Sequence, residues 1–170
     1  MSIEGEGPVL RGAEPFADFY RREFPKMVAL AFTVSGSRLV AEDIAQEALI
    51  DAELRWETVG RYDKPGAWVR RVTIQRSTKR LRRLRVEAAA LIRLAPVTGL
   101  APGPDDVEEV FEAIGKLPSK QRAAVALHYL DGYTVAEVAA ILECAEGTAK
   151  VHLHRARTAL ARTLGEEIDA

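Results

Sequence analysis

The sequence predicts an all-α protein in which a flexible linker joins two small helical domains. Apolar residues recur at three- and four-residue steps through most of the chain, and no alternating run bounded by turn residues predicts a sheet. A proline- and glycine-rich stretch, LAPVTGLAPGPDD, separates the two helical parts and is typical of a tether. We therefore expect an N-terminal tail over 1–13, a first domain over 14–93, a linker over 94–105 and a second domain over 106–166.

The composition is that of a soluble globular protein, with 48% hydrophobic and 29% charged residues. Cys144 is the single cysteine, so no internal disulfide can form, and the histidines lack zinc-site spacing. No signal peptide or membrane-length apolar run is present, which favours a reducing cytoplasm. Without a phosphate loop or a nucleophile–base pattern, we expect no enzyme activity, no metal or other cofactor and no membrane partner.

The formal net charge of −1 conceals a segregated pattern. Residues 61–93 hold 11 basic and two acidic side chains, while the segments on either side are acidic. Such a block is where a polyanion would bind, although a solvated helix face is the alternative.

The first domain begins with a helix after Pro15 that ends at the break Ser35-Gly36-Ser37, with Pro25 expected to break or kink it. The next helix is predicted over 38–56. One of its faces is an apolar stripe that should pack inward, made of Ala41, Ile44, Ala45, Ala48 and Ala52. Almost opposite lies a second stripe that mixes carboxylates with aliphatic residues: Asp43, Gln46, Glu47, Ile50 and Leu54. This second stripe is either a partner surface or a solvated face with two incidental aliphatics.

A third helix follows Asp63-Lys64-Pro65, and a shift in its apolar phase predicts a bend near Gln75. Basic residues crowd this helix, and phosphate is the usual counter-charge for such a cluster. Trp68 is either a stacking platform for an unstacked base or a core residue at helical spacing.

The second domain predicts a helix-turn-helix. Ser119 is expected to cap a helix that ends near Asp131-Gly132, and Thr134 with Glu137 forms a capping box for a short helix. After a tight connection over 143–146, a longer helix opens at Gly147. Its inward residues are Ala149, Leu153, Ala156 and Leu160, while its outward face is basic, as in a DNA recognition helix. A two-helix turn within an ordinary bundle is the alternative.

Together these segments resemble the extracytoplasmic-function sigma factors of the bacterial sigma-70 family. AEDIAQEALIDAELRW (41–56) is similar to the family's polymerase-docking helix, and GAWVRRVTIQRSTKRLRR (66–83) to its −10 promoter reader. LPSKQRAAVALHYLDGYTVAEVAAILECAEGTAKVHLHRARTAL (117–160) resembles the −35-binding domain. The resemblance implies a transcription initiation factor with core RNA polymerase and promoter DNA as partners, and in many members a regulatory anti-sigma factor.

The resemblance also implies roles for individual residues. Polymerase binding falls on Asp43, Gln46, Glu47, Ile50 and Leu54. Binding of the −10 element as a single strand falls on Trp68, Arg71, Gln75, Arg76, Lys79, Arg80, Arg82 and Arg83. Binding of the −35 duplex falls on Thr148, Lys150, Val151, His152 and Arg155.

This chain departs from the family pattern at two places. Gln75 stands where many relatives carry Asn, and Val151-His152 stands where Ser-Arg is common, so the promoter preference is expected to differ. Two other functions use the same scaffold. A sigma-like decoy that sequesters a regulator has no need of a basic recognition helix, and a stand-alone repressor leaves the second stripe unexplained.

Overall fold

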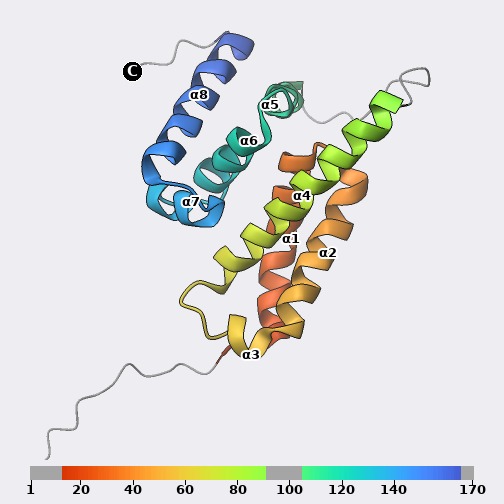
Figure 1. The fold of residues 1–170 in the computed structure, drawn as a ribbon, viewed down its shortest axis with the longest axis vertical. Helices are drawn as coiled ribbons and strands as arrows, with labels where there is room; N and C mark the ends of the chain where they lie inside the picture. Colours follow the sequence, from red (N-terminus) through yellow and green to blue (C-terminus); the bar gives the residue numbers. More distant parts are fainter. Residues whose placement is uncertain (1–12, 91–104, 166–170) are drawn as a thin grey trace, which may run out of the picture.

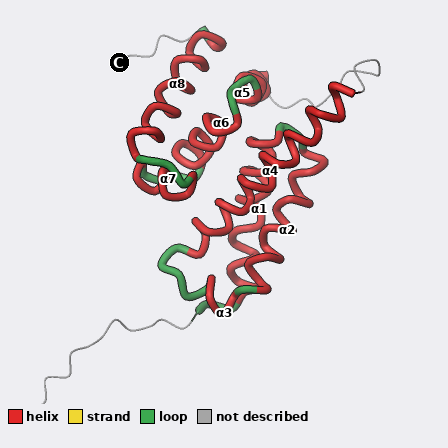
Figure 2. Tube along the Cα trace, in the orientation of Figure 1, coloured by secondary structure: helices red, strands yellow, loops and turns green. Residues whose placement is uncertain are grey.

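The computed structural model describes residues 13–90 and 105–165, and every regular element within these ranges is a helix (Figures 1 and 2). The predicted linker lies almost wholly outside the described residues. The first unit contains α1 (Phe16–Ser35), α2 (Arg38–Leu54), α3 (Trp56–Val59) and α4 (Pro65–Ala90). The second contains α5 (Asp105–Gly115), α6 (Ser119–Val125), a π-helical turn (Ala126–Leu130), α7 (Val135–Leu142) and α8 (Glu146–Leu164). The predicted all-α class is confirmed.

Helix α1 runs without a break through Pro25, so the expected break there is wrong. Proline removes one backbone donor, but Phe19 and Met27, on either side of it, are buried in one apolar cluster that holds both halves together. The helix ends as predicted at Gly36, whose φ of 73° is left-handed and whose N–H donates to Phe32 O at 2.8 Å.

Helix α2 ends two residues before the predicted boundary, because Trp56 begins the short helix α3. The indole ring turns inward, with ring centroids 5.3 Å from Phe16 and 4.7 Å from Phe19, and its Nε1 donates to Glu14 O at 2.9 Å. This aromatic cluster closes the end of the α1–α2–α4 bundle.

Helix α4 continues as one element through Gln75, where a bend was expected. The apolar residues move to another side of the helix along its length because the elements that α4 packs against change. Val69 packs into the core shared with α1 and α2, whereas Ile74 packs into a second core that includes residues of α6 and α7.

In the second unit, Ser119 does not cap α6: it is the first helical residue, follows Pro118, and makes no capping hydrogen bond. The helix widens into a π-helical turn in which Asp131 N donates to Ala126 O at 3.1 Å, five residues back. Gly132, with φ of 75°, then reverses the chain, as the sequence predicts.

The helix-turn-helix forms as predicted. Glu137 N donates to Thr134 Oγ1 at 3.2 Å and Thr134 N donates to Glu137 Oε2 at 2.8 Å, which completes the capping box of α7. Glu143, with φ of 56°, makes the turn into α8.

The two units share a core, which the sequence did not predict. Leu30, Val34 and Ile74 of the first unit belong to the same buried cluster as Leu127 and Val138 of the second. In the fold, α6 contacts α1 and α7 contacts α4 (Figure 1). The position of the second unit is therefore fixed by packing against the first.

Candidate functional site

Within the described residues, the outer face of α2 is largely exposed to solvent. All five residues of the predicted second stripe are exposed, whereas the alanine-rich stripe beneath it is fully buried. Ile50 is 52% exposed and Leu54 77% exposed. Leu39, at 87%, adds an aliphatic residue one turn earlier that the sequence reasoning missed, although helical spacing from Asp43 could have revealed it.

One edge of this face is tied to α4. Arg76 Nη1 donates to Glu47 Oε2 at 3.0 Å, and its Nε donates to Asp51 Oδ2 at 3.2 Å. Hydrogen bonding to Asp51 raises the pKa of Arg76, a group that is charged in any case. Arg76 thus already has two carboxylate partners, unlike the other basic residues of the predicted −10 set.

The −10 set is divided between two faces of α4. Arg71, Gln75, Lys79 and Arg82 line a groove on the side of the second unit. Arg76, Arg80 and Arg83 lie on the side of α2, in a shallow depression that Lys79 also borders. Trp68 is half-buried and packs against the first unit's core, and it also borders a small pocket with Tyr62 and Lys64.

Helix α8 presents its predicted outward face. Thr148, Lys150, Val151 and Arg155 are exposed, while Ala149, Leu153 and Ala156 are buried as expected. Leu160, the last of the four inward residues, is partly buried at the edge of the same side. His152 is half-buried because it turns toward α6 and the groove.

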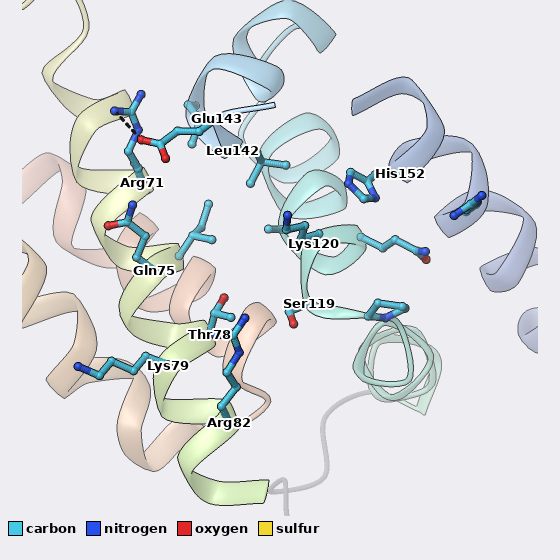
Figure 3. A pocket seen from close by; sticks show the side chains of 16 residues that line it. Arg71, Gln75, Thr78, Lys79, Arg82, Ser119, Lys120, Leu142, Glu143 and His152 are labelled. Carbon is cyan, nitrogen blue, oxygen red and sulfur yellow. Dashed lines mark ion pairs between the residues drawn. The ribbon is translucent and has the colours of Figure 1, made fainter. Parts of the chain in front are cut away.

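The groove has a volume of about 820 Å³ and brings the two predicted DNA-binding sets together. Figure 3 shows Arg71, Gln75, Lys79 and Arg82 on α4, with Lys120 and His152 across from them. Glu143 is the one carboxylate among the described residues that line it, and it pairs with Arg71 at 3.3 Å (Figure 3). Burial, followed by the charges of Lys120 and Arg155, lowers the pKa of His152 and so favours the neutral imidazole.

Two arginines whose burial the sequence did not reveal join the units. Arg70, 4% exposed, bonds Glu23 and Asp131; Arg122, 3% exposed, donates from Nη1 to Val34 O at 2.9 Å and from Nε to Leu117 O at 2.7 Å. Each lies in a basic or polar sequence context with no periodic signal to mark it as buried.

Within residues 13–90 and 105–165, no group of three or more His, Cys, Asp or Glu side chains is placed to hold a metal ion. No helix in them is both long and apolar enough to cross a bilayer.

Comparison with known families and proteins gives consistent matches. The sigma-70 region 2 family matches residues 19–86, and the sigma-70 region 4 family matches residues 108–160. The ECF RNA polymerase sigma factor SigM of Mycobacterium tuberculosis is 34% identical over 152 residues, covering 88% of this chain and 77% of SigM. SigW of Bacillus subtilis, another ECF RNA polymerase sigma factor, is 29% identical over 167 residues, covering 89% of each chain.

Solved structures show the same fold. The sigma factor RpoE, in its complex with the anti-sigma factor NepR from Bartonella quintana, matches with a TM-score of 0.77 at 24% identity, covering 91% of this chain and 98% of that one. CnrH, solved with the cytosolic domain of CnrY, gives a TM-score of 0.63 at 21% identity, covering 88% and 87% of the two chains. The resemblance seen in the sequence is confirmed: this chain belongs to the extracytoplasmic-function sigma factors of the sigma-70 family, which bind core RNA polymerase and direct promoter recognition.

Proposed function

We propose that the outer face of α2 docks on core RNA polymerase. The observation that supports this most strongly is the exposure of three aliphatic side chains, Leu39, Ile50 and Leu54, among carboxylates on a helix whose opposite face is fully buried. Aliphatic anchors surrounded by charge fit a partner helix that is basic and partly apolar. The proposed contact set is Asp43, Gln46, Glu47, Ile50 and Leu54, and we include Leu39 because it is exposed on the same face.

The region-2-like unit, 14–93, is proposed to read the −10 element through α4. Arg71, Lys79 and Arg82 supply phosphate contacts from the groove side, and Arg80 and Arg83 extend the basic surface around the helix. Gln75 is exposed between the basic residues and is proposed to contact an unstacked base, with Trp68 bordering the adjacent pocket. Arg76 is also proposed to bind the −10 element, after its ion pairs with Glu47 and Asp51 on α2 have broken.

The region-4-like unit, 106–166, is proposed to place α8 in the major groove of the −35 element. Thr148, Val151, His152 and Arg155 are assigned to base edges or the adjoining backbone, and Lys150 to phosphate. The exposure of this first half of α8 supports the assignment. His152 cannot form the two-pronged contact of an arginine with guanine, and Val151 is suited to a thymine methyl group.

The experiment that tests these assignments is run-off transcription with core polymerase, using wild-type and substituted chains on a library of promoters. The expected result is promoter-dependent transcripts from the wild type, lost on substitution in the α2 face and redirected on substitution of Val151 and His152. Promoter-independent binding to duplex DNA without any stimulation of polymerase would instead favour the stand-alone repressor.

A regulatory partner is proposed as well. The relatives RpoE and CnrH were captured with NepR and with the cytosolic domain of CnrY, and we propose that an anti-sigma factor binds this chain too. Sigma factors are not enzymes as a class. The chain is proposed to work in the cytoplasm, where polymerase is, without a catalytic activity or cofactor of its own.

A further inference from the structure

The groove bordered by α4, α6 and α8 gathers cations that have no internal counter-charge. Arg82 on α4, Lys120 on α6 and Arg155 on α8 line it, and within residues 13–90 and 105–165 none of the three forms an ion pair. Glu143 is the one carboxylate among the described lining residues, and Arg71 already pairs with it at 3.3 Å. The positive charge of the groove is therefore left for something outside the described chain to balance.

The electrostatic effect of these cations reaches the neighbouring side chains. The charges of Lys120 and Arg155 add to burial in lowering the pKa of His152, which lies on the groove side of α8 (Figure 3). On α6, burial and then the charge of Arg85 lower the pKa of Arg122. Like charges brought together in this way repel one another, and a bound anion would turn the repulsion into attraction.

The groove also holds polar groups that the described chain leaves unused. His152 Nδ1 and Arg71 Nε are buried and have no hydrogen-bond partner among the described residues, which is rare for buried polar atoms. Hydroxyl groups face the groove from both sides: Figure 3 shows Thr78 on α4 and Ser119 at the start of α6. Oxygen atoms of an anionic ligand would find hydrogen-bond donors here as well as charge.

The remaining wall of the groove is apolar. Ile74, Ile141 and Leu142 line it, and Ile141 is only 4% exposed. The volume, about 820 Å³, lies within the range of roughly 300–1,000 Å³ that is usual for pockets that hold organic ligands and is far more than an inorganic anion fills. An apolar wall with a few converging polar groups is the usual form of a small-molecule site. The groove therefore fits a ligand with one anionic part and one apolar part.

We propose that this groove binds a small molecule of nucleotide size that carries a diphosphate group. The terminal phosphate of such a group carries about 1.5 to 2 negative charges at pH 7 and the inner phosphate adds another, which matches the three unpaired cations. Arg82 and Arg155 offer guanidinium forks to phosphate oxygens, and Lys120 offers a point charge. The organic part of the ligand lies against Ile141 and Leu142.

This site is a separate inference from the reading of DNA. Lys120 belongs to neither of the proposed DNA-binding sets, whereas Arg82 and Arg155 are shared with them. Ligand binding is measured without DNA or polymerase, so failure of the site and failure of the DNA-binding roles are distinguishable.

The test is titration calorimetry of the full chain at fixed salt with three probes: ADP, inorganic diphosphate and adenosine. The groove variant is Arg82→Ala with Lys120→Ala. Its matched control, Arg83→Ala with Lys26→Ala, removes the same charge from exposed positions on α4 and α1 that do not line the groove. Arg82 and Lys120 are exposed as well, so both variants should keep the fold, and circular dichroism checks this.

The expected result is saturable binding of ADP with one site per chain, tighter than that of either inorganic diphosphate or adenosine. The groove variant should bind ADP about tenfold more weakly, because it loses two charge-assisted contacts, and the control should stay within about twofold of the wild type.

Three outcomes would overturn the proposal. Absence of saturable ADP binding to the wild type would remove the site. Equal weakening in the groove variant and the control would show that the general surface charge, and not the groove, attracts the anion. Diphosphate that binds as tightly as ADP would show that the apolar wall takes no part, and the assignment of a nucleotide-sized ligand would be wrong.

Discussion

The outer face of α2 and the groove face of α4 are both charged helical surfaces, but they differ in what covers them. The α2 face exposes Leu39, Ile50 and Leu54 to solvent. The α4 face looks across a groove at α6 and α8, and its Arg71 is paired with Glu143. Among the described residues, the proposed docking surface on α2 is therefore open to solvent, whereas the proposed −10 surface on α4 is partly covered by the second unit.

The largest effect is expected on the open surface. Replacing Leu39 and Leu54 with Glu places charge at the centre of the proposed docking surface, and should weaken core binding by about thirtyfold or more, some 2 kcal/mol. Pull-down and titration with core polymerase measure it. Val107→Glu, an exposed aliphatic position on α5, is the control and should leave binding unchanged. Normal core binding by the double variant would remove α2 from the docking surface.

The two faces of α4 should respond differently to loss of charge. Lys79→Ala with Arg82→Ala removes cations that pair with no carboxylate within residues 13–90 and 105–165, and should weaken open-complex formation by about tenfold and flatten its salt dependence by about two phosphates. Arg76→Ala should instead release Glu47 and Asp51, cost less than about 1 kcal/mol of stability and change the salt dependence less. Permanganate footprints of the promoter bubble, recorded over a series of salt concentrations, compare the two variants. An equal salt dependence of open-complex formation in both would contradict the assignment of different roles to the two faces of α4.

A smaller effect concerns sequence choice at −35. Val151→Ser with His152→Arg restores the pair common in the family, and should shift the selected −35 sequence, because an arginine–guanine contact is worth about 1–3 kcal/mol of discrimination. Lys150→Ala should weaken binding evenly across sequences. Promoter-library selection measures both variants. The base-reading assignment fails if the swap and the wild type select the same −35 sequence.

The smallest expected effect is on the pH dependence of the stability of the folded chain. Burial, then Lys120 and Arg155, lowers the pKa of His152 in the folded chain, so below about pH 6.5 the unfolded chain binds more protons. The charged or titratable residues sharing its groove are Arg71, Lys79 and Arg82 on α4, Lys120 on α6, Glu143 in the turn after α7 and Arg155 on α8. Above this pH the imidazole is neutral in both states and costs nothing, and stability is lost as the pH falls from there through the lowered pKa of His152 in the folded chain. The melting temperature should fall slightly on acidification, and less in His152→Gln.

Local signals in the sequence were sufficient for most of the helices. Gly36 predicted the end of α1, and the Thr134–Glu137 capping box predicted the start of α7. Both could be predicted because backbone conformation and capping hydrogen bonds depend on a few neighbouring residues. The uninterrupted passage of α1 through Pro25 could not be predicted in this way, since it depends on burial of Phe19 and Met27.

The candidate surfaces were foreseeable where periodicity marks an outward face, as on α2 and α8. Their arrangement was not. Arg70 and Asp131 are 61 residues apart, and Arg122 and Val34 are 88 apart, so no local pattern relates them. Single long-range contacts of this kind decide how two helical units are docked. Because the second unit packs along one side of α4, some residues of the predicted −10 set face that unit and the others face α2.

Photo-crosslinkers at Leu54 and at Lys79, placed one at a time in the complex of this chain with core polymerase and promoter DNA, test the division between the two surfaces most directly. Leu54, which is 77% exposed on α2, is expected to crosslink to polymerase, and Lys79, which lines the groove, to promoter DNA. Crosslinking of Leu54 to DNA and of Lys79 to polymerase, in a complex that produces transcripts, would contradict this division.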